Sequence, residues 1–212
     1  MRIIGGSCKG RRLLAPGGRL GGRLRPTADR AREGLFNILG PRVRGAAVLD
    51  LFAGTGALGL EALSRGAASA LLLEQDREVY RLLQRNLALC GFTEPVARLG
   101  RRDCGGRLDF LAPLAPAGGF HLVLADPPYG RGLAAGVLRE LARLVAASLP
   151  GERGGDGAGT GVLAVDALVV LETGRGETLP EVTTGLTSAW PARRYGEALF
   201  HFYQIRKNEL CG

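Results

Sequence analysis

From residue 46 onward the sequence alternates between short apolar runs and amphipathic segments with helical spacing, and this alternation limits the possible folds more than any other feature. Runs typical of buried strands cover residues 47–51, 70–74, 95–99, 120–125 and 167–172. Segments with helical spacing follow them, from the turn at 54–59 to about residue 64 and then at 77–90, 108–111 and 133–149. Strands that alternate with helices favour a parallel sheet with helices on both faces. We therefore predict an α/β fold.

A glycine-rich loop, Gly54-x-Gly56-x-x-Gly59, directly follows the first predicted strand. Glycines at this spacing permit a sharp turn and a close approach of the backbone to a ligand, and the pattern matches the dinucleotide-binding fingerprint of Rossmann-like proteins. Glu74 lies twenty residues after Gly54, at the end of the second strand, where an acid accepts hydrogen bonds from two ribose hydroxyls. The loop therefore predicts a nucleotide-like cofactor.

The loop alone does not separate NAD from S-adenosylmethionine. Asp50 favours the latter, because it is placed to hold a cationic or amino-bearing group, and Phe52-Ala53 replaces the usual approach to a pyrophosphate. Asp103 follows the third strand and accepts from an adenine amino group or, alternatively, pairs with a neighbouring arginine. The predicted cofactor-binding residues are Asp50, Phe52, Ala53, Gly54, Thr55, Gly56, Glu74, Gln75, Asp103 and Cys104.

A stiff turn, Asp126-Pro127-Pro128-Tyr129, ends the fourth strand. Neither proline can donate to a sheet, and each fixes its own φ, so the strand must stop there. The carboxyl edge of a parallel sheet is where ligands bind in α/β proteins. A carboxylate and a carbonyl can accept hydrogen bonds from an amino group, while a tyrosine can stack on a flat ring. We predict that Asp126, Pro127, Pro128 and Tyr129 form a catalytic turn that holds a nucleobase amine; the alternative is a simple turn with a solvated aspartate.

The chain carries a formal net charge of +8, and its only lysines are Lys9 and Lys207. A GC-rich genome would explain arginine in place of lysine, but not the excess of bases over acids. Such an excess favours a polyanionic partner. Residues 1–45 form a basic, glycine-rich extension with a hairpin and a helix; the alternative is a solvated arm that only covers the sheet. The predicted RNA-binding residues are Lys9, Arg11, Arg12, Arg23, Arg25, Arg30 and Arg32.

We expect a single domain of 212 residues, in which 46–212 form the catalytic core and the glycine-rich stretch 150–161 is an insertion. The strand-like segments 183–195 and 199–205 predict an antiparallel C-terminal hairpin. The four cysteines are far apart, so neither a metal site nor a disulfide framework is expected. No apolar run is long enough to cross a bilayer and residues 1–6 contain no apolar region of a signal peptide, which favours a cytoplasmic protein with reduced thiols.

Residues 50–66, with Glu74-Gln75-Asp76 and Asp126–Tyr129, resemble the bacterial 16S rRNA guanine-N2 methyltransferases of the RsmD family. The similarity extends over nearly the whole chain. Its most specific part is the N-terminal signature, because the glycine loop and the Asp-Pro-Pro-Tyr turn are common to many amino-methyltransferases. The matching segments are 2–6, 10–11, 25–37 and 193–196.

The resemblance implies a class I methyltransferase with a seven-stranded sheet, which uses S-adenosylmethionine to methylate the N2 amine of one guanine in a 16S rRNA loop. The partner would be free rRNA or an assembling small ribosomal subunit, and we expect a monomer. Three alternatives stay open from sequence alone. They are a DNA adenine-N6 or cytosine-N4 methyltransferase, a non-catalytic RNA-binding or assembly factor on the same fold, and an NAD oxidoreductase.

Overall fold

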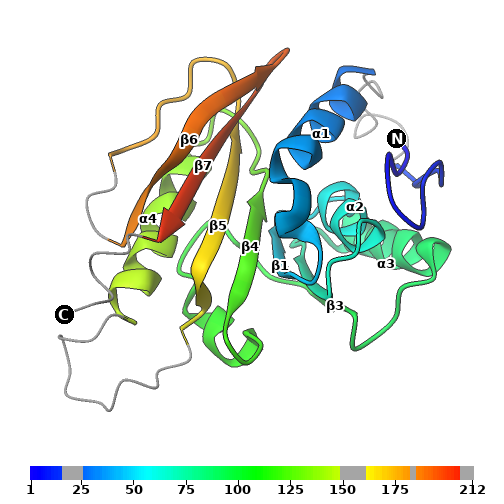
Figure 1. Ribbon diagram of the computed structural model, residues 1–212, viewed down its shortest axis with the longest axis horizontal. Helices are drawn as coiled ribbons and strands as arrows, with labels where there is room; N and C mark the ends of the chain where they lie inside the picture. The colour runs from blue at the N-terminus through cyan, green and yellow to red at the C-terminus, as the bar shows by residue number, and fades with distance from the viewer. Residues whose placement is uncertain (16–25, 149–160, 182–184, 206–212) are drawn as a thin grey trace.

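The computed structural model describes residues 1–15, 26–148, 161–181 and 185–205, with the side chains of 26–28 excepted. Strands and helices alternate along the chain, as expected (Figure 1). In order, the elements are α1 (Pro26–Leu39), η2 (Gly40–Val43), β1 (Ala47–Leu51), α2 (Ala57–Ser64), β2 (Ser69–Leu73), α3 (Arg77–Cys90), β3 (Ala97–Gly100), η3 (Asp109–Leu114), β4 (Phe120–Ala125), α4 (Leu133–Ala146), β5 (Leu163–Thr173), β6 (Leu186–Tyr195) and β7 (Ala198–Ile205).

The seven strands form one sheet in the order β3-β2-β1-β4-β5-β7-β6. The pairs from β3 to β5 are parallel, whereas β7 pairs antiparallel with both β5 and β6. The predicted sheet and its C-terminal antiparallel hairpin are therefore confirmed. The strand order reverses between β1 and β4, so their carboxyl ends border the crevice where ligands bind in such sheets.

Helices cover both faces of the sheet, because side chains on alternating strand positions point to opposite sides. On one face, Val48 of β1 and Leu122 of β4 pack in a cluster with residues of α1, α2 and α3. On the other, Leu49 and Val123 pack in a cluster with residues of η3 and α4. Figure 1 shows α4 on one side of the sheet and α1, α2 and α3 on the other.

The N-terminal segment folds into a short hairpin that is fixed to α2. The amide of Ile3 donates to the carbonyl of Arg11, and Gly10 donates back to Ile3. Glu61 of α2, fully buried, accepts hydrogen bonds from the amides of Ile4 and Gly5 at 2.7 and 2.8 Å. The hairpin predicted from sequence is thus present and packs on the core through one buried carboxylate.

Several boundaries differ from those predicted. β3 begins at Ala97 and not at residue 95, α4 ends at Ala146 and not at residue 149, and β5 begins at Leu163, four residues earlier than predicted. The predicted insertion at 150–161 lies almost entirely outside the described residues. Within the described part of the chain, no helix is both long and apolar enough to cross a membrane.

Candidate active site

The glycine loop between β1 and α2 depends on backbone conformations that glycine adopts without strain. Gly54 and Gly56 have φ values of 56° and 86°, and a Cβ at Gly56 would lie 2.5 Å from Leu83. Phe52 also has a positive φ, 61°, which is uncommon for a residue with a side chain. The loop therefore turns tightly enough to leave its backbone open to a ligand beside β1.

Asp50 supports this loop through a hydrogen bond to α2, while its predicted contact with a cationic or amino-bearing group stays a prediction. Its side chain is 1 % exposed, and Oδ2 accepts a hydrogen bond from the Gly59 amide at 2.8 Å. Burial raises the pKa of Asp50 to about 7, against the lowering effect of the Gly59 bond, and Glu74 raises it further. Asp50 lines neither of the two cavities described below, and its observed hydrogen bond fixes the start of α2.

Glu74 joins the end of β2 to the glycine loop. Its Oε2 accepts from the Gly54 amide at 3.0 Å and its Oε1 accepts from the Asp76 amide at 2.7 Å. These bonds fix the carboxylate, and each oxygen keeps a second lone pair for a ligand hydroxyl. The Asp76 side chain in turn caps α3 by accepting from the amides of Glu78 and Val79. Glu74 is therefore fixed between the end of β2, the glycine loop and the start of α3.

A cavity of about 440 Å³, which we call the loop cavity, opens between the glycine loop and the Asp126–Tyr129 turn. Its size falls in the range of small-molecule sites. It brings together half of the predicted cofactor-binding residues and the whole of the predicted catalytic turn. The lining residues are Phe52, Gly54, Leu73, Glu74, Gln75, Val79, Arg102, Cys104, Asp126, Pro127, Pro128 and Tyr129.

The loop cavity fits a nucleoside. Glu74 supplies acceptors for ribose hydroxyls, and Leu73 and Val79 supply apolar wall. Cys104 is a buried residue of the cavity wall. Because this burial raises the pKa of its thiol to about 12, the thiol stays protonated. Among the described residues, no three His, Cys, Asp or Glu side chains gather in a way that could hold a metal ion.

Four other predicted cofactor-binding residues do not line this cavity. The Thr55 hydroxyl points to the sulfur of Met1, and Ala53 and Gly56 shape the loop. Asp103 is exposed, and its Oδ1 accepts from the Gly105 amide at 2.8 Å. It forms no salt bridge with another residue of the described chain, so the alternative pairing with a neighbouring arginine is not observed, and the contact with an adenine amino group stays a prediction.

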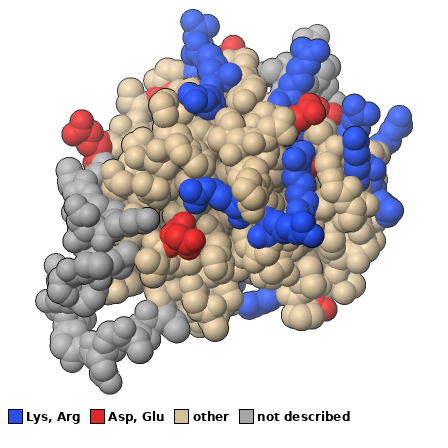
Figure 2. Space-filling view, in the orientation of Figure 1, with Lys and Arg blue, Asp and Glu red and all other residues tan. Residues whose placement is uncertain are grey.

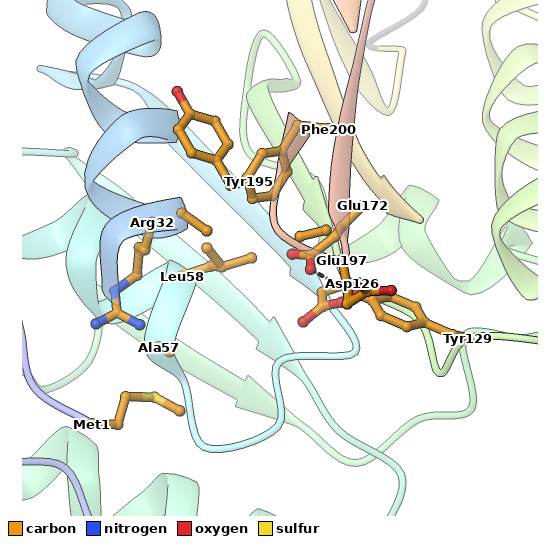
Figure 3. Close-up of a pocket in the computed structure, with 12 residues that line it drawn as sticks. Met1, Arg32, Ala57, Leu58, Asp126, Tyr129, Glu172, Tyr195, Glu197 and Phe200 are labelled. Carbon is orange, nitrogen blue, oxygen red and sulfur yellow. Dashed lines mark hydrogen bonds between the residues drawn. The ribbon is translucent and has the colours of Figure 1, made fainter. Parts of the chain in front are cut away.

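A second cavity, of about 210 Å³, lies on the other side of the turn, and we call it the hairpin cavity. It is bordered by α1 and α2 on one side and by the C-terminal hairpin on the other (Figure 3). Figure 3 shows the carboxylates of Asp126, Glu172 and Glu197 across from Arg32 and Leu58. The residues that line it are Met1, Ala31, Arg32, Ala57, Leu58, Asp126, Tyr129, Glu172, Tyr195, Glu197, Ala198 and Phe200.

Only Asp126 and Tyr129 line both cavities, which places the end of β4 between them. Asp126 is exposed to the cavities at the end of β4, although nearby protein atoms desolvate its carboxylate. Its pKa lies well above the ordinary value, first because of this desolvation and then because of the nearby carboxylates of Glu172 and Asp50. A hydrogen-bond donor or a cation that binds beside Asp126 relieves that repulsion between carboxylates.

Two acids from the end of β5 and the loop after it fix the Asp126–Tyr129 turn. Glu172 accepts a hydrogen bond from the Tyr129 hydroxyl. Glu177 accepts from the amides of Gly130 and Gly174, so one carboxylate joins both segments. A Cβ at Gly174 would lie 2.8 Å from the Tyr129 ring. The ring therefore packs closely on backbone, although 43 % of the residue stays exposed.

The predicted RNA-binding residues separate into three groups. Lys9, Arg11, Arg12 and Arg30 are exposed, and Lys9 and Arg30 border one groove of about 430 Å³ with Arg2. Arg23 and Arg25 lie outside the described residues. Figure 2 shows most basic side chains of the drawn face over its right half, where α1, α2, α3 and the N-terminal hairpin lie in Figure 1.

Arg32 contradicts the prediction, because it is only 4 % exposed and pairs inside the protein. Its guanidinium bonds to Asp29 at 3.0 Å and to the carbonyl of Arg2, and its Nε lies 3.7 Å from Glu61. The helical spacing of α1 did not reveal this burial, because only Asp29 belongs to α1, whereas the other two partners belong to the N-terminal hairpin and to α2. Arg32 holds the extension on the core and borders the hairpin cavity, so it is not part of the exposed basic surface.

Sequence reasoning missed four residues that shape the hairpin cavity or its turn: Glu172, Glu177, Tyr195 and Glu197. Glu172 carried a usable signal, since it is an acid at the carboxyl end of a predicted strand, as Glu74 is. The other three reach the site only because β7 inserts between β5 and β6 and because the loop after β5 folds back. Tyr195 packs directly over Gly34, where a Cβ would lie 2.3 Å from its ring.

Comparison with known proteins identifies relatives over nearly the full chain. The family model described as Conserved hypothetical protein 95 matches residues 1–204. The Ribosomal RNA small subunit methyltransferase D of Escherichia coli (strain K12) is 38% identical over 96% of this chain and 89% of its own length. Two solved structures share the fold across at least 96% of both chains. A putative methyltransferase, yhhF, from Escherichia coli has a TM-score of 0.72 at 35% identity, and a putative methylase from Haemophilus influenzae has 0.70 at 29%.

Proposed function

The chain belongs to the RsmD family, that of the small-subunit rRNA methyltransferase D proteins, and on that premise we propose that it methylates the exocyclic N2 amine of a guanine in 16S rRNA, with S-adenosylmethionine as the methyl donor. One observation carries the proposal: Asp126 and Tyr129 form a shared wall between two cavities. A transferase needs this arrangement, because two bound molecules must meet at one point.

The loop cavity takes the cofactor. Glu74 accepts the ribose hydroxyls, the backbone around Gly54 lies against the ligand, and Leu73 and Val79 contact its base. When bound, S-adenosylmethionine supplies an electrophilic methyl group and a positive charge. That charge stabilises the ionised form of Asp126, whose pKa is raised by desolvation and by neighbouring carboxylates.

The hairpin cavity takes the target base. Tyr129 stacks on the base, while the Asp126 carboxylate and the Pro127 carbonyl accept the hydrogens of the amine. The amine is a poor nucleophile because its lone pair is delocalised into the ring, and two acceptors turn that lone pair toward the cofactor side. Alignment and fixed charge supply the acceleration. A base in a loop is easier to splay into the cavity than a base in a helix.

The exposed cations of the N-terminal extension bind the RNA backbone. Lys9, Arg11, Arg12 and Arg30 are the candidates that the structure leaves exposed. We treat residues 1–45 as an RNA-contacting part of a single domain, acting as a monomer on free rRNA or on an assembling small ribosomal subunit. Since that substrate is cytoplasmic, we infer the same location for the protein.

Incubation with radiolabelled S-adenosylmethionine tests the proposal directly. The substrates are 16S rRNA, assembled small ribosomal subunits and duplex DNA, and the modified nucleoside is identified by mass spectrometry after digestion. We expect label in N2-methylguanosine from one of the two RNA substrates. Label in the DNA, or no transfer to either RNA substrate, would contradict the proposal.

A further inference from the structure

Glu172 and Asp126 lie side by side because of the register between two parallel strands. Ala125 of β4 pairs with Leu171 of β5, and the next residue on each strand is the acid. Both side chains line the hairpin cavity, and Figure 3 shows them on the same wall. The pair therefore presents two carboxylates to whatever occupies the cavity.

One carboxylate oxygen of Glu172 accepts a hydrogen bond, and the other has no donor among the described residues. Oε1 accepts from the Tyr129 hydroxyl, and within the described chain no donor bonds to Oε2. Burial raises the pKa of Glu172, while the hydrogen bond from Tyr129 lowers it. The carboxylate is thus oriented by a neighbour and keeps a free acceptor beside Asp126.

Guanine offers two neighbouring donors on its Watson–Crick edge, the N1–H and the N2 amine. Adenine has an acceptor at N1, and a carboxylate opposite that nitrogen would repel it. Enzymes read an extruded base through hydrogen bonds to this edge. A site built to accept from a substrate N–H strongly rejects an analogue that lacks it, because buried polar groups are then left unpaired.

We propose that Glu172 determines the selectivity for guanine by accepting the N1–H of the base whose N2 amine bonds to Asp126. This inference rests on the proposed function, since it assumes that the target base enters the hairpin cavity. Glu197 is the other carboxylate there, but it is exposed, lies in the β6–β7 turn and makes no hydrogen bond to the catalytic turn within the described residues. Glu172 is the better candidate because it is fixed next to Asp126.

An RNA with 2,6-diaminopurine at the target position tests this contact. That base keeps the 2-amino group, has no hydrogen on N1 and carries an amine in place of O6, and the change at position 6 is the same for the wild type and for the variant compared with it. The ratio of kcat/KM for guanine to kcat/KM for diaminopurine is measured for the wild type and for Glu172→Gln. We expect the wild type to prefer guanine at least about 100-fold. We expect Glu172→Gln to reduce that ratio at least about 10-fold, because the glutamine amide can donate to N1.

A further variant distinguishes base reading by Glu172 from a general effect of removing a carboxylate. Glu197→Gln changes the other free carboxylate of the hairpin cavity and should keep the guanine-to-diaminopurine ratio within about threefold of wild type. The proposal would be overturned if Glu172→Gln lowered kcat/KM equally for the guanine and the diaminopurine RNA. It would also be overturned if the ratio of the two values changed in Glu197→Gln and not in Glu172→Gln.

If Glu172→Gln fails to fold, the guanine-to-diaminopurine ratio of the wild type still tests the inference. Equal kcat/KM values of the wild type for the two bases would contradict the role of Glu172 but not the proposed methylation. Absence of methyl transfer to the guanine RNA would instead contradict the proposed function itself.

Discussion

The Oδ2 atom of Asp50 accepts a hydrogen bond from the amide of Gly59 at 2.8 Å, which ties the end of β1 to the first turn of α2. The bond spans the whole glycine loop. A Cβ at Gly59 would lie 2.9 Å from the same oxygen and 2.6 Å from Leu72, so the close approach requires a glycine there. The shape of the loop cavity therefore depends on one buried carboxylate behind it.

This burial predicts a pH-dependent stability. The pKa of Asp50 is about 7 in the folded protein, above its ordinary value of 3.8, so between about pH 4 and 7 the folded state keeps a proton that the unfolded state has lost. Stability from this group is therefore lost as pH rises through that window, at about 1.4 kcal/mol for each pKa unit of difference. Asp50→Asn does not titrate and keeps an acceptor for Gly59. Urea unfolding at pH 5 and pH 8 should show the variant gaining stability relative to wild type as pH rises; a constant difference would contradict this.

The attachment of the N-terminal hairpin predicts a contrast between two glycines. Gly6 and Gly10 have φ values of 75° and 84°, but a Cβ at Gly6 would lie 1.7 Å from the Ser64 carbonyl oxygen, whereas at Gly10 it would meet nothing within 4 Å. Gly10→Ala should cost about 1 kcal/mol for backbone strain. Gly6→Ala should cost about 2 kcal/mol more, because the hairpin must move off α2. Equal losses in chemical denaturation would show that the hairpin does not pack as described.

The carboxylate of Glu61 should be far more important to stability than an exposed acid on α1. It is fully buried, accepts from two backbone amides and pairs with Arg65 at 2.7 Å. Glu61→Ala leaves these donors unpaired and should reduce the free energy of unfolding by about 3–5 kcal/mol. Glu33→Ala, on an exposed position of the same extension, should change it by less than about 0.5 kcal/mol. The comparison fails if both variants unfold at the same denaturant concentration.

RNA binding by the extension predicts a change in salt dependence. Lys9→Ala and Arg30→Ala each remove one exposed cation from the groove that both residues border. Each should flatten the slope of log binding constant against log salt by about 0.7 if the phosphate is in a single strand. Arg107, exposed and paired with Asp109 beside η3, is the control, and Arg107→Ala should leave the slope unchanged. A filter-binding titration in which all three variants behave alike would place the RNA elsewhere.

Most of the architecture could be predicted because its signals are local. The apolar runs, the glycines at 54, 56 and 59 and the double proline after β4 fix strands and turns within a few residues. The buried contacts of Asp50 and Arg32 were not predicted because they come from distant segments, α2 for the first and the N-terminal hairpin for the second. The hairpin cavity was missed for the same reason, since its walls meet only through the sheet order.

The most direct test of the proposed chemistry is methyl transfer to small-subunit rRNA by Asp126→Asn, with donor binding measured by calorimetry on the same samples. Asp166→Asn, an exposed position on β5, is the matched control and should match wild type in both measurements. We predict that Asp126→Asn binds S-adenosylmethionine within a few-fold of wild type and loses at least about 100-fold in transfer rate. Transfer at the wild-type rate by Asp126→Asn would contradict the central claim that this carboxylate holds the reacting amine.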